Sequence, residues 1–211
     1  MKRMIVGVLA LGLGACAGAP QGDSIPIHDF DPSFSSAMCA SAGWDRAKLD
    51  DLKAAKFEIA DNEARQAFAK AITACLASPD PELRDKIAFE ALTHMLRGRQ
   101  LSAPTQKALL ADLVARLDAP AGQGFEQPFA ALALSEVARA DRVEAFLTED
   151  ELIKLLVDAQ HWFINVSDYR GYDAAEGWRH GVAHGADLLM QLALNPRIDA
   201  EGLSVIVSAV G

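Results

Sequence analysis

From Asp45 onward, apolar residues recur every three or four positions almost without interruption, which is the spacing of amphipathic helices. The segment after Ser102 is a clear example, because Leu109, Leu113 and Leu117 fall on one helical face. No stretch alternates apolar and polar residues for long enough to form a sheet. The pattern therefore predicts an all-α domain over residues 45–211.

The expected helix starts share one feature, a residue that can cap a helix directly before an apolar-periodic segment. Thr148 and Glu151 have the spacing of a capping box. The helices follow each other in pairs of roughly 35–45 residues, a length typical of HEAT or armadillo repeats. We therefore expect stacked antiparallel helix pairs in a short HEAT- or armadillo-like solenoid. The other predicted caps are Asp45, Asp61, Asp80, either Ser102 or Thr105, and Asp199.

The chain begins with MKRMIVGVLALGLGAC, which has the features of a bacterial lipoprotein signal. Lys2 and Arg3 precede an apolar stretch that is too short to span a bilayer as a stable helix. Small residues then stand before Cys16, as a signal peptidase that acts on lipoproteins requires. We expect residues 1–15 to be removed and Cys16 to be lipidated. The alternative is an ordinary secretory signal in which the cysteine is coincidental.

Residues 16–44 are predicted to tether the helical domain to a membrane, because they are rich in Gly, Pro, Ser and Asp without a period. Ala17, rather than aspartate, follows the cysteine, which favours the outer over the inner membrane. We therefore predict a lipid-anchored protein of the cell envelope that faces the periplasm. Its acyl chains would make the membrane one of its partners.

The charge of the chain argues against one class of partner, and its cysteines allow at most one disulfide in the mature protein. The chain has 20 basic and 29 acidic residues and a formal net charge of −9, so we expect no nucleic-acid partner. If Cys16 is lipidated, Cys39 and Cys75 remain. In an oxidising envelope these two cysteines could form one disulfide, and the alternative is a pair of buried thiols that never meet.

Most of the candidate chemistry lies in Asp168–Leu189, DYRGYDAAEGWRHGVAHGADLL. We expect a helix over residues 174–194, which would place His180, His184 and Asp187 in one polar stripe on its accessible face. This stripe is predicted to border a groove that binds a protein, a peptide or a small ligand. Since zinc uses histidines four residues apart on a helix, a divalent metal site is a second possibility.

The identity of a third metal ligand stays open. Asp187 is the nearest carboxylate in the stripe, but it would lie about 10 Å along the helix axis from His180. Asp168 or Asp173, in the preceding loop, could complete a site with the two histidines. Such a site would support a metal-assisted hydrolase, whereas acid–base chemistry by the histidines against Asp187 would need no metal.

A purely structural interpretation is also open, because buried polar groups need partners. In that case Asp187 would fix the tautomer of His184, and the histidines would hold the preceding loop against the helix. Arg170 would form ion pairs between Asp168 and Asp173. Tyr169, Tyr172 and Trp178 would be packing residues, and Phe129 and Glu136 are expected near the site from a neighbouring helix pair.

Three blocks of sequence resemble the bacterial family DUF2785. They are SPDPELRDKIAFEAL (Ser78–Leu92), FAALALSEVARAD (Phe129–Asp141) and YRGYDAAEGWRHGVAHGADLL (Tyr169–Leu189). The resemblance implies an all-α fold and no particular activity. Members usually carry more helical sequence after the region matching Leu203–Val210, which implies a truncated chain or a missing capping helix. It also implies that one set of residues forms a shared feature: Arg170, Gly171, Tyr172, Trp178, His180, His184 and Asp187.

Overall fold

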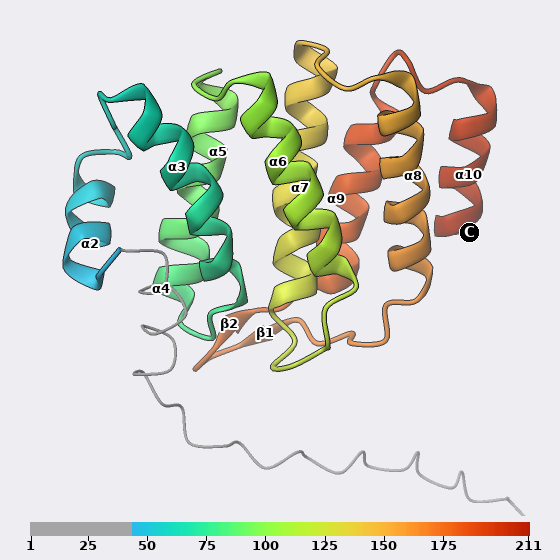
Figure 1. Cartoon of the computed structure of the whole chain (residues 1–211). Helices are drawn as coiled ribbons and strands as arrows, with labels where there is room; N and C mark the ends of the chain where they lie inside the picture. Colours follow the sequence, from blue (N-terminus) through green and yellow to red (C-terminus); the bar gives the residue numbers. More distant parts are fainter. Residues whose placement is uncertain (1–43) are drawn as a thin grey trace, which may run out of the picture. The chain divides into compact units, whose positions relative to one another are not determined.

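The computed structural model describes residues 44–211, which are helical almost throughout and confirm the all-α prediction (Figure 1). Within this part of the chain, one short hairpin of β1 (Tyr172–Asp173) and β2 (Gly177–Trp178) interrupts the helices. The helices are α2 (Arg46–Ala54), α3 (Asn62–Ile72), the 3₁₀ segment η1 (Thr73–Ala77), α4 (Pro81–Leu83), the π-helical segment η2 (Arg84–Phe89), α5 (Glu90–Arg97), α6 (Ala103–Leu117), α7 (Glu126–Val143), α8 (Glu149–Ile164), α9 (Gly181–Ala193) and α10 (Ala200–Val210).

The predicted caps are present. The Thr148 hydroxyl accepts a hydrogen bond from the backbone N–H of Glu151, and the Glu151 carboxylate accepts one from the backbone N–H of Thr148, which confirms the capping box. These bonds satisfy backbone donors that have no partner inside the helix. The same role is taken by Asp45, Asp61, Asp80, Ser102 and Asp199.

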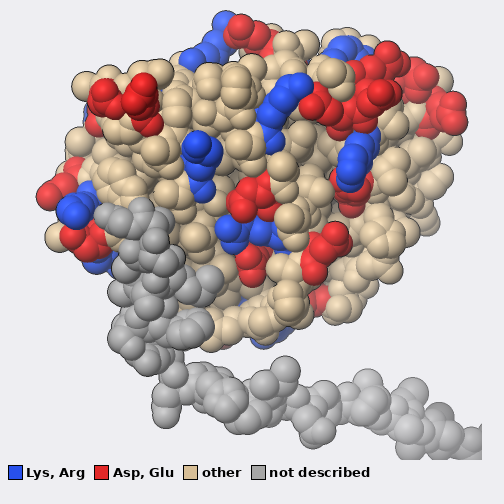
Figure 2. All heavy atoms as spheres, in the orientation of Figure 1, with Lys and Arg blue, Asp and Glu red and all other residues tan. Residues whose placement is uncertain are grey.

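The helices form two layers. In one layer α3 contacts α6, α6 contacts α8, and α8 contacts α10, whereas α5, α7 and α9 follow each other in the second layer (Figure 1). Helix α7 is the central element, since it packs on α5, α6 and α9. Many of its residues are buried, among them Phe129, Leu134 and Val137. Acidic and basic side chains are interspersed over the face shown in Figure 2.

The helix from Pro81 to Arg97 is α-helical at both ends and π-helical in the middle, over η2. Arg84 begins the π-helical segment and is wholly buried together with Ile87 and Ala88. π-Helical turns are rare and are found mostly as local insertions at functional positions. Here the turn carries a charged side chain that reaches the hairpin.

The predicted helix over residues 174–194 is wrong in its first third, because α9 begins at Gly181. Residues 172–178 form the hairpin instead, with Tyr172 opposite Trp178. Asp173 accepts hydrogen bonds from the backbone N–H groups of Ala175 and Glu176. This local bonding competes with a helix, and Gly177 at φ +77° and His180 at φ +52° then take left-handed conformations that a helix excludes.

Cys75 is buried and disulfide-bonded, so it is not a free buried thiol. The other two cysteines, Cys16 and Cys39, lie outside the described residues, as do the predicted signal (residues 1–15) and nearly all of the predicted tether. Among the helices of residues 44–211, none has both the length and the apolar character needed to cross a bilayer.

Candidate functional site

The hairpin is fixed to the ends of α7 and α4 by the buried side chain of Arg84. One guanidinium nitrogen, Nη2, donates to the backbone carbonyl of Glu176 at 2.9 Å, and Nη1 donates to the carbonyl of Ser78 at 3.0 Å. The guanidinium also lies over the rings of Phe125 and Phe129, with its carbon 4.2 and 4.6 Å from their centroids. Arg84 therefore joins three segments that are distant in the sequence.

A second buried arginine, Arg179, directly follows β2 and also binds the turn of the hairpin. Its Nη2 donates to the Glu176 carboxylate at 2.7 Å, and its Nε donates to the Gln123 carbonyl at 3.2 Å. Its guanidinium lies on the Phe125 ring, 4.3 Å from the centroid. Glu176, in the turn of the hairpin, is thus bound twice: Arg84 binds its backbone carbonyl and Arg179 binds its carboxylate.

Five aromatic rings form a continuous line from the hairpin into the core. Tyr172 contacts Trp178 at 4.8 Å between ring centroids, and Trp178 contacts His180 at 4.0 Å. His180 lies 6.0 Å from His184, whose ring meets that of Phe129 edge to face at 4.9 Å. The outer end is open to solvent, because Tyr172 is 62% and Trp178 46% exposed, and the inner end is buried. Tyr172 and Trp178 therefore pack on each other, but at the surface rather than in the core.

His184 is only 9% exposed and lies on the buried face of α9 with Leu188 and Leu192. This position contradicts the predicted accessible stripe. Burial lowers the pKa of His184 to about 4, with smaller contributions from His180 and Arg84 and an opposing one from the Pro128 carbonyl. The ring is therefore neutral at neutral pH, and its Nδ1 lies 3.2 Å from the Pro128 carbonyl, to which it donates.

Asp187 does not orient His184, since Pro128 occupies the Nδ1 position. Among the described residues, the Asp187 carboxylate makes no hydrogen bond or ion pair. Burial raises the pKa of Asp187, and the nearby Glu136 raises it further. Phe129 and Glu136 therefore lie near this site, as expected. Phe129 contacts His184, whereas Glu136 affects Asp187.

The charged loop before the hairpin has one of the two predicted ion pairs. The Arg170 guanidinium binds both carboxylate oxygens of Asp168, at 2.6 Å between Nη2 and Oδ2, and this pairing lowers the pKa of Asp168. Asp173 binds the backbone of the turn rather than Arg170. The Asp168–Arg170 pair lies directly against Gly124, where a side chain would approach both residues to 2.7 Å.

His180 and His184 do lie close together. The two loop carboxylates are already bound, Asp168 to Arg170 and Asp173 to the backbone of the turn. Within residues 44–211, no three His, Cys, Asp or Glu side chains are grouped so that they could hold one ion.

The second half of the chain, residues 113–211, matches the protein family DUF2785, which is described as a protein of unknown function. The match covers 99 of the 211 residues and leaves out the residues before Leu113. The chain matches no curated protein and no solved structure at a significant level.

The DUF2785 region contains all five rings of the aromatic line and also Arg179. Arg84, on which Phe129 rests, comes from outside the matched residues. Sequence reasoning missed both arginines as parts of the site. A signal was present for Arg84, which stands at helical spacing from Ile87 and Ala88 on an otherwise apolar face.

Proposed function

We propose that this chain is a lipid-anchored module of the cell envelope that binds a protein or peptide partner through its hairpin. We call the exposed surface of Tyr172, Trp178 and the adjoining His180 the aromatic hairpin. The observation that carries the proposal is the pair of exposed, mutually packed aromatic side chains on a hairpin that two buried arginines hold in place.

Tyrosine and tryptophan dominate the energetics of protein interfaces, because they bury a large area and lose little conformational entropy. A surface that is already ordered adds further affinity, since less freedom is lost on binding. Tyr169, which is 78% exposed, and the Asp168–Arg170 pair stand beside the aromatic hairpin and supply further contacts. Together these residues offer an apolar centre with a charged rim, as binding surfaces do.

The anchor and the location are supported by the Leu13–Cys16 sequence and by the disulfide of Cys75, since disulfides persist in oxidising compartments. We further propose that the two helical layers form a short HEAT- or armadillo-like solenoid, an arrangement supported by the succession of helix pairs. In such stacks, surfaces at the ends of the helices are available for partners.

A photo-crosslinking amino acid in place of Tyr172, in cells that produce the full chain, tests the binding function. We expect a discrete crosslinked species that disappears when Trp178→Ala is added. The matched control carries the crosslinker at Val157, which is 52% exposed but lies on α8. Adducts that are as frequent at Val157 as at Tyr172, or that are insensitive to Trp178→Ala, would contradict the proposal.

The predicted alternative, a metal-assisted hydrolase that uses His180, His184 and Asp187, has less support. The Nδ1 atom of His184 is bonded to the backbone, and the ring is largely buried. Metal analysis of protein purified without chelators separates the two functions. Stoichiometric zinc that is lost in His184→Ala would favour the hydrolase over the binding module.

A further inference from the structure

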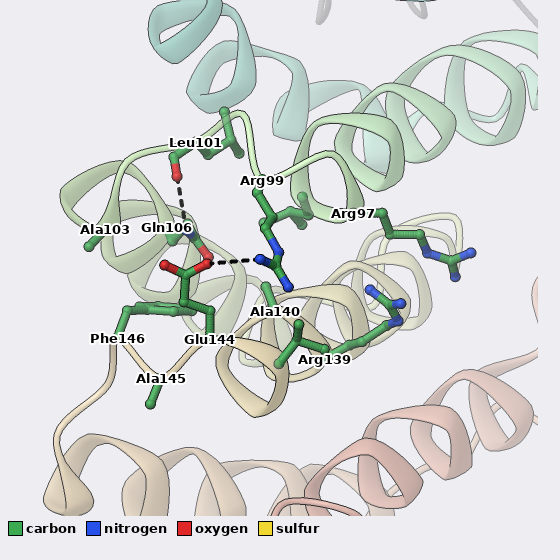
Figure 3. Close-up of a pocket in the computed structure, with 12 residues that line it drawn as sticks. Arg97, Arg99, Leu101, Ala103, Gln106, Arg139, Ala140, Glu144, Ala145 and Phe146 are labelled. Atoms are coloured by element: carbon green, nitrogen blue, oxygen red, sulfur yellow. Dashed lines mark hydrogen bonds and ion pairs between the residues drawn. The ribbon is translucent and has the colours of Figure 1, made fainter.

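A cavity of about 270 Å³ lies at the opposite end of α7 from the aromatic hairpin (Figure 3). The end of α5, the start of α6 and the end of α7 with the following loop form its walls. We propose that this cavity binds a small oxyanion, a carboxylate or a phosphate monoester, that carries a short apolar chain. The proposal rests on two arginines, Arg99 and Arg139, and on the apolar walls.

The three arginines on the wall, Arg97, Arg99 and Arg139, differ in how they are engaged. Arg97 donates to the buried carboxylate of Glu136 at 2.8 Å, and Figure 3 shows its guanidinium directed away from the cavity. Arg99 reaches Glu144 only at 3.7 Å, which is too long for a hydrogen bond. Arg139 makes no side-chain hydrogen bond or ion pair within residues 44–211. The Arg139 guanidinium is therefore free, and that of Arg99 is only loosely paired with Glu144, which also lines the cavity.

A free guanidinium presents paired N–H donors that match the oxygens of a carboxylate or a phosphate. Basic residues near the ends of α5 and α7 also interact well with the helix dipoles, which accounts for their presence at these ends. The helix dipoles do not explain why Arg139 lines a cavity without a carboxylate as its ion-pair partner. Such a partner would be easy to supply, because the chain has nine more acidic than basic residues. An anion from solution would provide that partner.

The rest of the wall sets the size and character of the ligand. Apolar side chains line it, including Leu101, Val143 and Phe146. The volume is just below the ~300–1,000 Å³ of sites for drug-sized ligands, so the apolar part must be short. Gln106 on the wall donates to the Leu101 carbonyl, but its own amide oxygen is buried and has no donor among the described residues. This oxygen is also closed to solvent, so the ligand class follows from the arginines and the apolar wall.

N-acetylleucine carries the carboxylate and the apolar chain, and N-acetylleucinamide is its neutral control. Isothermal titration of the full chain with these compounds and with isopentyl phosphate tests the site. We expect binding of the carboxylate, the phosphate ester or both, and none of the amide. Preference between the two anions identifies which oxyanion the cavity takes. Equal binding of acid and amide, or binding of neither anion, would overturn the proposal.

Substitutions in the cavity wall test whether the anion binds there. Arg139→Gln and Arg99→Gln should each weaken the anion by about tenfold or more, because each removes a charge-assisted bond. Glu144→Gln should strengthen binding, since it releases Arg99. Arg142→Gln is the matched control, because Arg142 binds Gln191 and does not line the cavity. If Arg142→Gln weakens the anion as much as Arg139→Gln does, the cavity is not the site.

Discussion

Replacing Arg84 by methionine tests the most unusual feature of the fold, a wholly buried guanidinium beneath the hairpin. Methionine retains most of the length and the apolar packing of the side chain. The substitution removes the bonds to the Ser78 and Glu176 carbonyls and the stacking on Phe125 and Phe129. We expect the free energy of unfolding to fall by about 3–5 kcal/mol, as when one partner of a buried charged network is removed.

The ion pair with Asp85 is not the main source of this stabilisation. Burial lowers the pKa of Arg84 and raises the pKa of Asp85, so for each side chain the cost of desolvation exceeds the gain from pairing. Asp85 is also partly exposed and can be solvated without Arg84. The loss therefore comes from the charged hydrogen bonds to the backbone carbonyls of Ser78, Pro79 and Glu176, at about 1.5–3 kcal/mol for each bond, and from the ring contacts.

Urea and thermal unfolding of the full chain, followed by circular dichroism, measure this loss. For a domain of this size, a change of 3–5 kcal/mol corresponds to roughly 6–20 °C in the melting temperature. Arg46→Met is the control, because Arg46 binds Asp50 and Asp80 on an exposed surface and should cost no more than about 1 kcal/mol. If Arg84→Met is no more destabilising than Arg46→Met, the hairpin does not depend on the buried arginine.

Three further predictions follow from the site. The pKa of His184 is depressed, so its contribution to stability is complete above pH 6.5 and falls by roughly 3 kcal/mol as the pH drops to about 4. His184→Gln should therefore flatten the pH profile of urea unfolding in this window, and an unchanged profile would contradict the prediction. Gly185→Ala should destabilise the fold by about 1–2 kcal/mol, because the new methyl would lie 2.5 Å from Phe163, whereas helix propensity alone predicts a gain. Cys16→Ala should move the protein from the membrane fraction to the soluble fraction, and a variant that still sediments with lipid would refute the anchor.

The helices could be predicted from the sequence because their signals are local. A capping side chain binds a backbone N–H two or three residues away, and the apolar period repeats within each helix, so both can be read without the tertiary structure. Asp61 and the Thr148 capping box illustrate this, and both begin helices in the structure. The same reasoning correctly excluded a large sheet from the described residues.

The start of α9 could not be predicted in this way. Asp173 followed by two alanines and a glutamate has the composition of a helix start. The structure uses Asp173 to hold a turn, and the backbone carbonyl of Glu176 is bound by Arg84, which is 92 residues away in the sequence. A contact between such distant residues leaves no periodic trace, so the helix propensity of the segment was misleading.

His180, His184 and Asp187 do not form a site among themselves, because the partners of His184 come from α7 and not from the motif. The Pro128 carbonyl takes the Nδ1 proton of His184, and the Phe129 ring packs on its edge. Glu136, about two turns further along α7, raises the pKa of Asp187 instead of pairing with it. With its inner histidine bound to α7, the motif can meet a partner only through the outer end of the aromatic line. The exposed tyrosine and tryptophan, rather than the buried imidazole, are therefore the residues whose loss should abolish binding while the fold remains intact.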